Sequence, residues 1–197
     1  MDKELARQIF EELYKEIDGI SISLNERNAL NISSKEFVYG EINFDSFIEI
    51  VDKVKPKEDD IFYDLGSGTG KPCIAISLVY KIKKAVGIEL LNNLWETSNK
   101  ILKKLREEIR NPLEIEFRRG NILEEDFSDG TIIFSHATCF EDQTMEKLEK
   151  KLQSLKKGAR IILITKKLKG DEFELIDEGE KRMSWGYATY RIYKKIK

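Results

Sequence analysis

The most constraining feature of this sequence is a glycine-rich segment, Asp64-Leu-Gly-Ser-Gly-Thr-Gly-Lys71, that overlaps the end of an apolar run beginning at Ile61. Glycines let a backbone approach a ligand closely where a Cβ would clash. A helix that begins directly behind such a loop presents unpaired N–H groups to the ligand. A strand, a glycine loop and a helix in succession therefore predict the cofactor-binding corner of an α/β sheet.

The spacing of the glycines favours S-adenosylmethionine over NAD. Gly66, Gly68 and Gly70 form G-x-G-x-G, which is one residue shorter before the third glycine than the dinucleotide fingerprint, and Asp64 precedes them. Glu89 ends the next expected strand, 19 residues after Gly70, where a carboxylate can accept hydrogen bonds from both hydroxyls of a ribose. A Walker loop is excluded because no G-K-S/T follows at the required spacing.

Short apolar runs alternate with helical patterns from Asp60 onward, which indicates repeated β-α units around a parallel sheet. The last third of the chain has two β segments with no helix between them, joined by a turn near Trp185 and Gly186. An antiparallel hairpin is therefore expected to close the sheet. The expected strands are 61–65, 85–89, 115–118, 131–135, 160–165, 173–183 and 187–193, and the expected helices between them are 71–80, 94–109 and 145–155.

Two helices are predicted before the glycine loop. Apolar residues recur at helical spacing from Leu5 to Ile17 and stop before Gly19, which suits a helix with a glycine just past its end. Residues 21–35 are rich in Asn and Ser and predict a loop with at most one helical turn. A second amphipathic helix is expected over residues 44–54. We therefore expect a helical N-terminal cap at residues 1–36 and a sheet domain at residues 37–197.

The composition excludes several classes of protein. A chain of 197 residues that is 41% hydrophobic and 36% charged fits one soluble domain, and its charged N-terminus lacks the apolar run of a signal peptide or membrane span. The 34 basic and 36 acidic residues are the wrong balance for gripping nucleic acid along a broad basic face. Cys73 and Cys139 have no neighbouring thiol or histidine, which excludes a zinc site. We expect a cytoplasmic protein, or a nuclear one in a eukaryote, with reduced thiols.

Three stretches carry a resemblance to a known family. Val38-Tyr39-Gly40-Glu41 is similar to a V-Y-G-E loop, Phe62-Tyr-Asp-Leu-Gly-Ser-Gly-Thr-Gly to an F-V-D-L-G-S-G-x-G segment, and Met183-Ser184-Trp185 with Tyr190 and Tyr193 to an S-W turn and a tyrosine-bearing last strand. Over residues 37–197 the chain thus resembles the seven-strand, non-SET histone lysine methyltransferases, named for disruption of telomeric silencing. The resemblance implies a class I, Rossmann-like sheet, parallel except for one antiparallel C-terminal strand in a hairpin.

The resemblance also implies which residues hold S-adenosylmethionine. Tyr39, Gly40 and Glu41 would fold over its methionine end, Glu89 would take the ribose, and Asn121 stands where the family usually has an aspartate that binds the adenine amine. An Asn side-chain oxygen can still accept that bond. The expected cofactor-binding residues are Tyr39, Gly40, Glu41, Asp64, Gly66, Ser67, Gly68, Gly70, Lys71, Glu89, Asn121 and Ile122.

The motif after the fourth expected strand departs from the family. In Phe134-Ser-His136-Ala-Thr-Cys-Phe140, His136 replaces the asparagine that is expected to hold the target amine near the methyl group. A lone histidine is either a packed structural residue or, as an imidazole that titrates near neutral pH, a hydrogen-bond acceptor for an amine. Cys139 is expected to be a small buried filler. The candidates for the catalytic acceptor channel are Tyr39, His136, Phe140 and Tyr190.

The resulting hypothesis is a methyltransferase that acts on a lysine of a histone or another protein. Methyl transfer from a sulfonium requires alignment and a deprotonated amine, so the lack of a strong acid/base pair is compatible with it. Two alternatives stay open, namely a methyltransferase that acts on a small molecule or RNA, and a catalytically inactive S-adenosylmethionine-binding protein. We expect a monomer that binds no metal, no membrane and no nucleic acid strongly.

Overall fold

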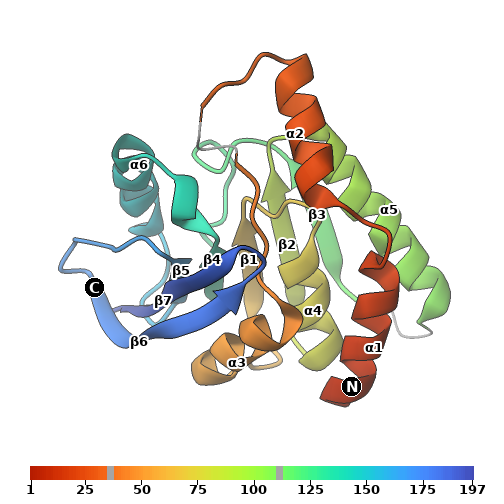
Figure 1. The fold of residues 1–197 in the computed structure, drawn as a ribbon. Coiled ribbons are helices and arrows are strands. Elements are labelled where there is room, and N and C mark those ends of the chain that lie inside the picture. The colour runs from red at the N-terminus through yellow and green to blue at the C-terminus, as the bar shows by residue number, and fades with distance from the viewer. Residues whose placement is uncertain (35–37, 110–112) are drawn as a thin grey trace.

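A seven-strand sheet forms the centre of the computed structural model, which describes residues 1–34, 38–109 and 113–197 (Figure 1). The strand order is β3-β2-β1-β4-β5-β7-β6. Neighbouring strands pair in parallel, except that β7 is antiparallel to both β5 and β6. This arrangement confirms the predicted Rossmann-like fold class. The strands are β1 (Ile61–Leu65), β2 (Lys84–Glu89), β3 (Ile115–Arg119), β4 (Ile132–Ser135), β5 (Arg160–Ile164), β6 (Phe173–Met183) and β7 (Gly186–Lys195).

Helices cover both faces of the sheet, as the almost uninterrupted burial of its central strands requires (Figure 1). Four of them, α1, α3, α4 and α5, supply residues to the core on one face, and α6 supplies residues to the core on the other. The helices are α1 (Lys3–Tyr14), α2 (Gly19–Ala29), α3 (Phe44–Val54), α4 (Lys71–Val79), α5 (Asn92–Glu108) and α6 (Asp142–Leu152), with a short 3₁₀ helix, η2 (Ala137–Cys139), after β4.

Aromatic packing joins α3 to the sheet. The Phe47 ring lies 5.2 Å from that of Phe134 on β4 and 6.1 Å from that of Phe62 on β1, both in edge-to-face geometry. All three side chains are at most 1% exposed. This contact fixes α3 against the start of β1 and the end of β4, the two strands that lead into the glycine loop and into His136.

The prediction for residues 15–34 is wrong in detail. Helix α1 ends at Tyr14, and Gly19 is the first residue of α2 rather than the cap of α1. The side chain of Asp18 caps α2 by accepting a hydrogen bond from the Ser21 N–H at 3.0 Å. The buried face of α2 consists of Gly19, Ser23 and Glu26, so the helix has no apolar stripe for a periodicity argument to find.

The N-terminal helix α1 shares the core of the sheet. Ala6, Phe10, Leu13 and Tyr14 are buried in the same hydrophobic cluster as residues of β1, α4 and α5. The predicted domain boundary at residues 36 and 37 lies outside the described residues and stays a prediction. Within the described ranges, no helix is both long and apolar enough to cross a membrane.

Candidate functional site

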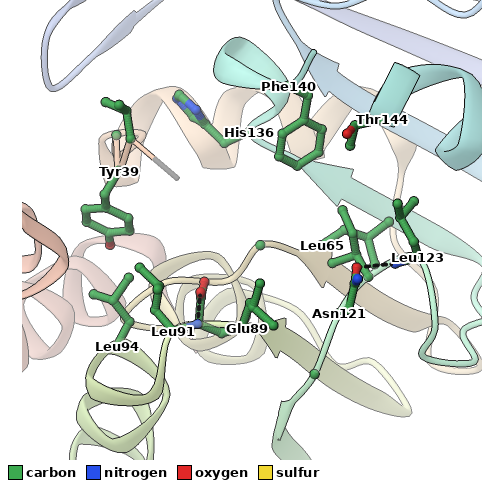
Figure 2. Close-up of a pocket in the computed structure, with 16 residues that line it drawn as sticks. Tyr39, Leu65, Glu89, Leu91, Leu94, Asn121, Leu123, His136, Phe140 and Thr144 are labelled. Carbon is green, nitrogen blue, oxygen red and sulfur yellow. Dashed lines mark hydrogen bonds between the residues drawn. The ribbon is translucent and has the colours of Figure 1, made fainter. Parts of the chain in front are cut away.

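A cavity of about 200 Å³ lies where the loops after β1, β2, β3 and β4 meet, at the carboxyl ends of the parallel strands (Figure 2). This is the edge at which open α/β sheets bind their ligands. A smaller crevice beside it shares four lining residues and adds Glu41, Asp64, Ser67 and Lys71. The main cavity is lined by Val38, Tyr39, Gly40, Leu65, Gly66, Glu89, Leu90, Leu91, Leu94, Gly120, Asn121, Ile122, Leu123, His136, Phe140 and Thr144.

The three glycines of the loop have different roles. Gly66 lines the cavity, has a φ of 87° and would have no atom within 4 Å of an added Cβ. A Cβ on Gly68 would lie 2.1 Å from Cε2 of Tyr39, so this glycine makes room for the tyrosine ring. Gly70 caps α4 with a φ of 85°. The structure therefore places Gly66 at the cavity, but neither Gly68 nor Gly70, which were predicted to bind the cofactor.

Glu89 ends β2 with its carboxylate held in a fixed plane. Its Oε1 accepts a hydrogen bond from the Leu91 N–H at 2.8 Å, shown dashed in Figure 2, and its Oε2 accepts one from the Gly68 N–H at 2.8 Å. Each oxygen keeps a further acceptor position. Burial raises the pKa of Glu89, while the backbone N–H groups oppose this shift. The side chain is thus ready to accept two more hydrogen bonds from a ligand.

Asp64 brings a second buried carboxyl group to the same edge. Its residue is 1% exposed, and its Oδ2 has no hydrogen-bond partner among the described residues, as is also true of the Ser67 Oγ. Burial, and then the nearby Glu89, raise the pKa of Asp64 well above its ordinary value. No ion pair in the described part of the chain neutralises either Asp64 or Glu89. Such a site favours a ligand that carries positive charge and several hydrogen-bond donors.

The segment Tyr39–Glu41 is held between the glycine loop and the β6–β7 turn. The Tyr39 hydroxyl donates to Glu41 Oε1 at 2.7 Å, and Glu41 forms an ion pair with Lys71 at the start of α4. The Ser184 N–H donates to the Glu41 carbonyl at 2.9 Å. Burial raises the pKa of Tyr39 well above its ordinary value, so its phenol stays protonated. These contacts place the segment over one side of the cavity.

His136 follows β4 with an unpaired ring nitrogen. Its Nε2 is buried and has no hydrogen-bond partner within the described residues. Burial lowers the pKa of His136 to about 4, so the expectation that it titrates near neutral pH is not met. The Trp185 ring lies 6.1 Å away in edge-to-face geometry, and a Cβ on Gly40 would lie 2.8 Å from Trp185 Nε1 and 3.4 Å from His136 Cε1. A neutral hydrogen-bond acceptor thus stands beside Gly40 and Trp185.

Tyr190 does not reach the cavity, in contrast to the prediction that it lines the acceptor channel. It is buried on β7, donates a hydrogen bond to Asp177 at 2.9 Å and lies beneath the Lys53 ammonium, 5.8 Å from its ring centre. The side chain therefore supports the packing of α3 on the hairpin.

Cys139 is partly exposed in η2 rather than a buried filler, whereas Cys73 is buried and its pKa is raised by that burial.

Asn121 and Ile122 line the cavity as expected. The Asn121 Oδ1 accepts a hydrogen bond from the Leu123 N–H at 2.9 Å, shown dashed in Figure 2. This bond orients the amide and leaves one acceptor position on the oxygen.

Sequence reasoning missed several residues that build the site. Leu90, Leu91 and Leu94 follow Glu89 directly and form an apolar wall, a position that the strand-end argument for Glu89 could have indicated. Trp185 was interpreted only as part of a turn, although it stands beside His136. Tyr14 donates to the Thr69 carbonyl at 3.0 Å across 55 residues of sequence, a contact for which no local pattern exists.

No group of three or more His, Cys, Asp or Glu side chains that could hold a metal ion occurs within residues 1–34, 38–109 and 113–197. Near the glycine loop Lys71 pairs with Glu41 and Glu89 accepts two backbone hydrogen bonds, whereas Asp64 Oδ2 and Ser67 Oγ have no partner among the described residues.

Several known proteins are similar to this chain. The model of the family described as "Histone methylation protein DOT1" matches residues 21–187. The chain is 32% identical over 159 residues to the histone-lysine N-methyltransferase, H3 lysine-79 specific, of Caenorhabditis elegans, covering 74% of this chain and 17% of that protein. It is 32% identical over 111 residues to a protein-lysine N-methyltransferase of Saccharolobus islandicus (strain REY15A), covering 55% of this chain and 63% of that one.

Among solved structures, an RNA methyltransferase from Salinibacter ruber in complex with S-adenosyl-L-homocysteine has a TM-score of 0.56 and 24% identity, covering 78% of this chain and 91% of that one. This likeness concerns the fold. The chain spans less than two thirds of the length of either curated relative.

Proposed function

Because the chain belongs to the DOT1 family of histone methylation proteins and has the class I S-adenosylmethionine-dependent methyltransferase fold, we propose that it is a protein-lysine N-methyltransferase. The observation that carries this proposal is the unpaired Nε2 of His136, which stands beside Gly40 and Trp185 and lines the same cavity as Glu89. A hydrogen-bond acceptor for an amine and a carboxylate for a ribose are thereby combined in one site.

The residues at the cavity fit S-adenosylmethionine. Glu89 has two free acceptor positions for the ribose hydroxyls, and Asn121 has one for the adenine amine. The orphaned polar atoms of Asp64 and Ser67 lie in the crevice beside them and suit the charged amino-acid end. The Lys71 ammonium, which is paired with Glu41, lines the same crevice. When bound, the cofactor supplies a methyl group on a sulfonium that is ready for in-line displacement.

In our proposal the acceptor lysine approaches between His136, Phe140 and Trp185. The aromatic rings exclude water from its amine and thereby favour the neutral form, which has the lone pair that displacement needs. The neutral His136 accepts a hydrogen bond from an amine N–H through Nε2 and so turns the lone pair toward the methyl group. Tyr39 and Gly40 close the other side of the cavity, so alignment by these residues supplies the catalysis.

A protein acceptor is supported by the surface around this channel. Trp185 is 49% exposed on the turn between β6 and β7, and Tyr187 is 71% exposed near the start of β7. Exposed aromatic side chains are typical of surfaces that bind another protein. The names of the Caenorhabditis elegans and Saccharolobus islandicus relatives specify a histone lysine and a protein lysine respectively. We propose that the acceptor is a lysine of a histone or another protein, and that the enzyme acts as a monomer inside the cell.

A labelling experiment tests this proposal. The purified protein is incubated with methyl-labelled S-adenosylmethionine and a host lysate, and the protein, RNA and small-molecule fractions are counted separately. We expect label in the protein fraction, and its loss in the Glu89→Ala variant. Label in RNA or in small molecules would identify one of the two other acceptor classes, and no label with intact cofactor binding would identify an inactive binding protein.

A further inference from the structure

Helix α2 holds the first turn of α5 through one carboxylate. Glu26 is 7% exposed, its Oε1 accepts a hydrogen bond from the Asn92 N–H at 2.8 Å, and its Oε2 accepts one from the Asn93 N–H at 2.7 Å. The residue at the cap position of α5 is Leu91, whose side chain accepts no hydrogen bond. Glu26 therefore serves as the cap of a helix that lies 66 residues further along the chain, and its charge suits the positive end of that helix.

The segment between Glu89 and Asn92 is a wall of the cavity. It contains only Leu90 and Leu91, both of which line the cavity, and the Leu91 N–H is one of the two donors that orient the Glu89 carboxylate. One end of this segment is fixed by the end of β2 and the other by the contacts of Asn92 and Asn93 with Glu26. A change at Glu26 therefore moves Leu91, and with it the donor to Glu89.

The first residue of α2 contacts a second segment of the cavity lining. A Cβ on Gly19 would lie 2.5 Å from Cε1 of Tyr39 and 2.9 Å from Oε1 of Glu41. The helix thus contacts the Tyr39–Glu41 segment at its first residue and the Leu90–Asn92 segment at Glu26. It therefore joins two segments that line the same cavity.

From this geometry we propose that Glu26 is a positioning residue for cofactor binding, which sets the adenosine end of the cavity by fixing the backbone of Leu91 to Asn93. The inference rests on the cofactor half of the proposed function and is independent of the methyl acceptor. Glu26 itself touches no ligand, because the hydrogen bonds of both its oxygens end on the backbone of α5.

The positioning role of Glu26 can be distinguished from a direct effect of its charge on Glu89. The negative charge of Glu26 is one of the influences that raise the pKa of Glu89. Removal of that charge alone would favour the ionised Glu89, which is the better acceptor for a ribose. A loss of affinity in a neutral variant therefore has to arise from the displaced backbone.

The test compares Glu26→Gln with a matched control, Glu149→Gln. Glu149 on α6 also accepts hydrogen bonds from two successive N–H groups, those of Lys169 at 2.9 Å and Gly170 at 2.6 Å, but lines no part of the cavity. Both variants replace one acceptor oxygen by an amide nitrogen that faces an N–H group. Isothermal titration measures the Kd of S-adenosylhomocysteine and of 5′-methylthioadenosine, which lacks the amino-acid end, for each protein.

We expect Glu26→Gln to raise both Kd values by the same factor, about tenfold, as for a lost charge-assisted hydrogen bond. Glu149→Gln should leave both Kd values within twofold of those of the wild type. We expect it to lower the thermal stability about as much as Glu26→Gln does. Glu26→Asp, which keeps the charge but is one methylene shorter, should give an intermediate Kd and covers the case that Glu26→Gln does not fold. An unchanged Kd in folded Glu26→Gln or Glu26→Asp, or an equal loss in Glu149→Gln, overturns the inference. If the variants show the expected Kd values but the wild type methylates no lysine, only the proposed methyl acceptor is contradicted.

Discussion

The ionisation of His136 gives a prediction whose magnitude follows from the structure. Burial lowers the pKa of this imidazole from 6.5 to about 4 in the folded protein. Because the folded pKa lies below the unfolded one, the unfolded state takes up the proton first as the pH falls. Stability from this group is therefore complete above pH 6.5 and is lost between pH 6.5 and pH 4. The linkage relation gives a loss of about 2 kcal/mol on going from pH 7 to pH 5.

Urea unfolding of the wild type and of His136→Asn, at pH 7 and at pH 5, measures this loss. Asp64 and Glu89 also have raised pKa values, but they are present in both proteins, so the difference between the two pH dependences isolates the histidine. We expect the wild type to lose about 2 kcal/mol more than His136→Asn. An equal loss in both proteins would show that His136 titrates as an ordinary imidazole, and the buried, water-excluded setting that the structure gives its ring would then be refuted.

Three further substitutions test separate parts of the site. Glu89→Ala should weaken binding of S-adenosylhomocysteine by roughly 2 kcal/mol or more by isothermal titration; unchanged affinity in the folded variant would remove Glu89 from the ribose site. Trp185→Ala should lower methyl transfer at least tenfold and leave the cofactor Kd within twofold, because the ring stands beside His136 and outside the cavity lining; full activity would exclude it from the acceptor channel. Tyr190→Phe should cost about 1 kcal/mol of stability through the lost bond to Asp177 and leave activity unchanged; a drop in activity without loss of stability would contradict its placement.

The sheet could be predicted from the sequence because each of its strands follows a local pattern. The run from Ile61 to Leu65 and the glycines after it fix a strand and a turn within ten residues. Glu89 could be predicted for the same reason, since the end of a strand next to the glycine loop faces the ligand in any parallel sheet.

The contacts that complete the site could not be predicted, because they join distant segments through single polar atoms. Glu26 reaches Asn92 and Asn93, and Tyr14 reaches the Thr69 carbonyl, without any periodicity in either helix that points to these partners. The contacts of Tyr190 with Asp177 and Lys53 could not be predicted for a related reason. Alternation along β7 says which residues share a face, but not that this face packs against α3 and Lys53 rather than the cavity.

The chemical identity of the methylated product tests most directly our proposal that this site transfers a methyl group to lysine. Protein labelled with methyl-labelled S-adenosylmethionine is hydrolysed completely to amino acids, which are separated and compared with standards. We predict that the label migrates with ε-N-methylated lysines and is absent when His136→Ala or Glu89→Ala replaces the wild type. Label that migrates with methylated arginine, histidine or a nucleoside, and none with methylated lysine, would contradict lysine as the methyl acceptor.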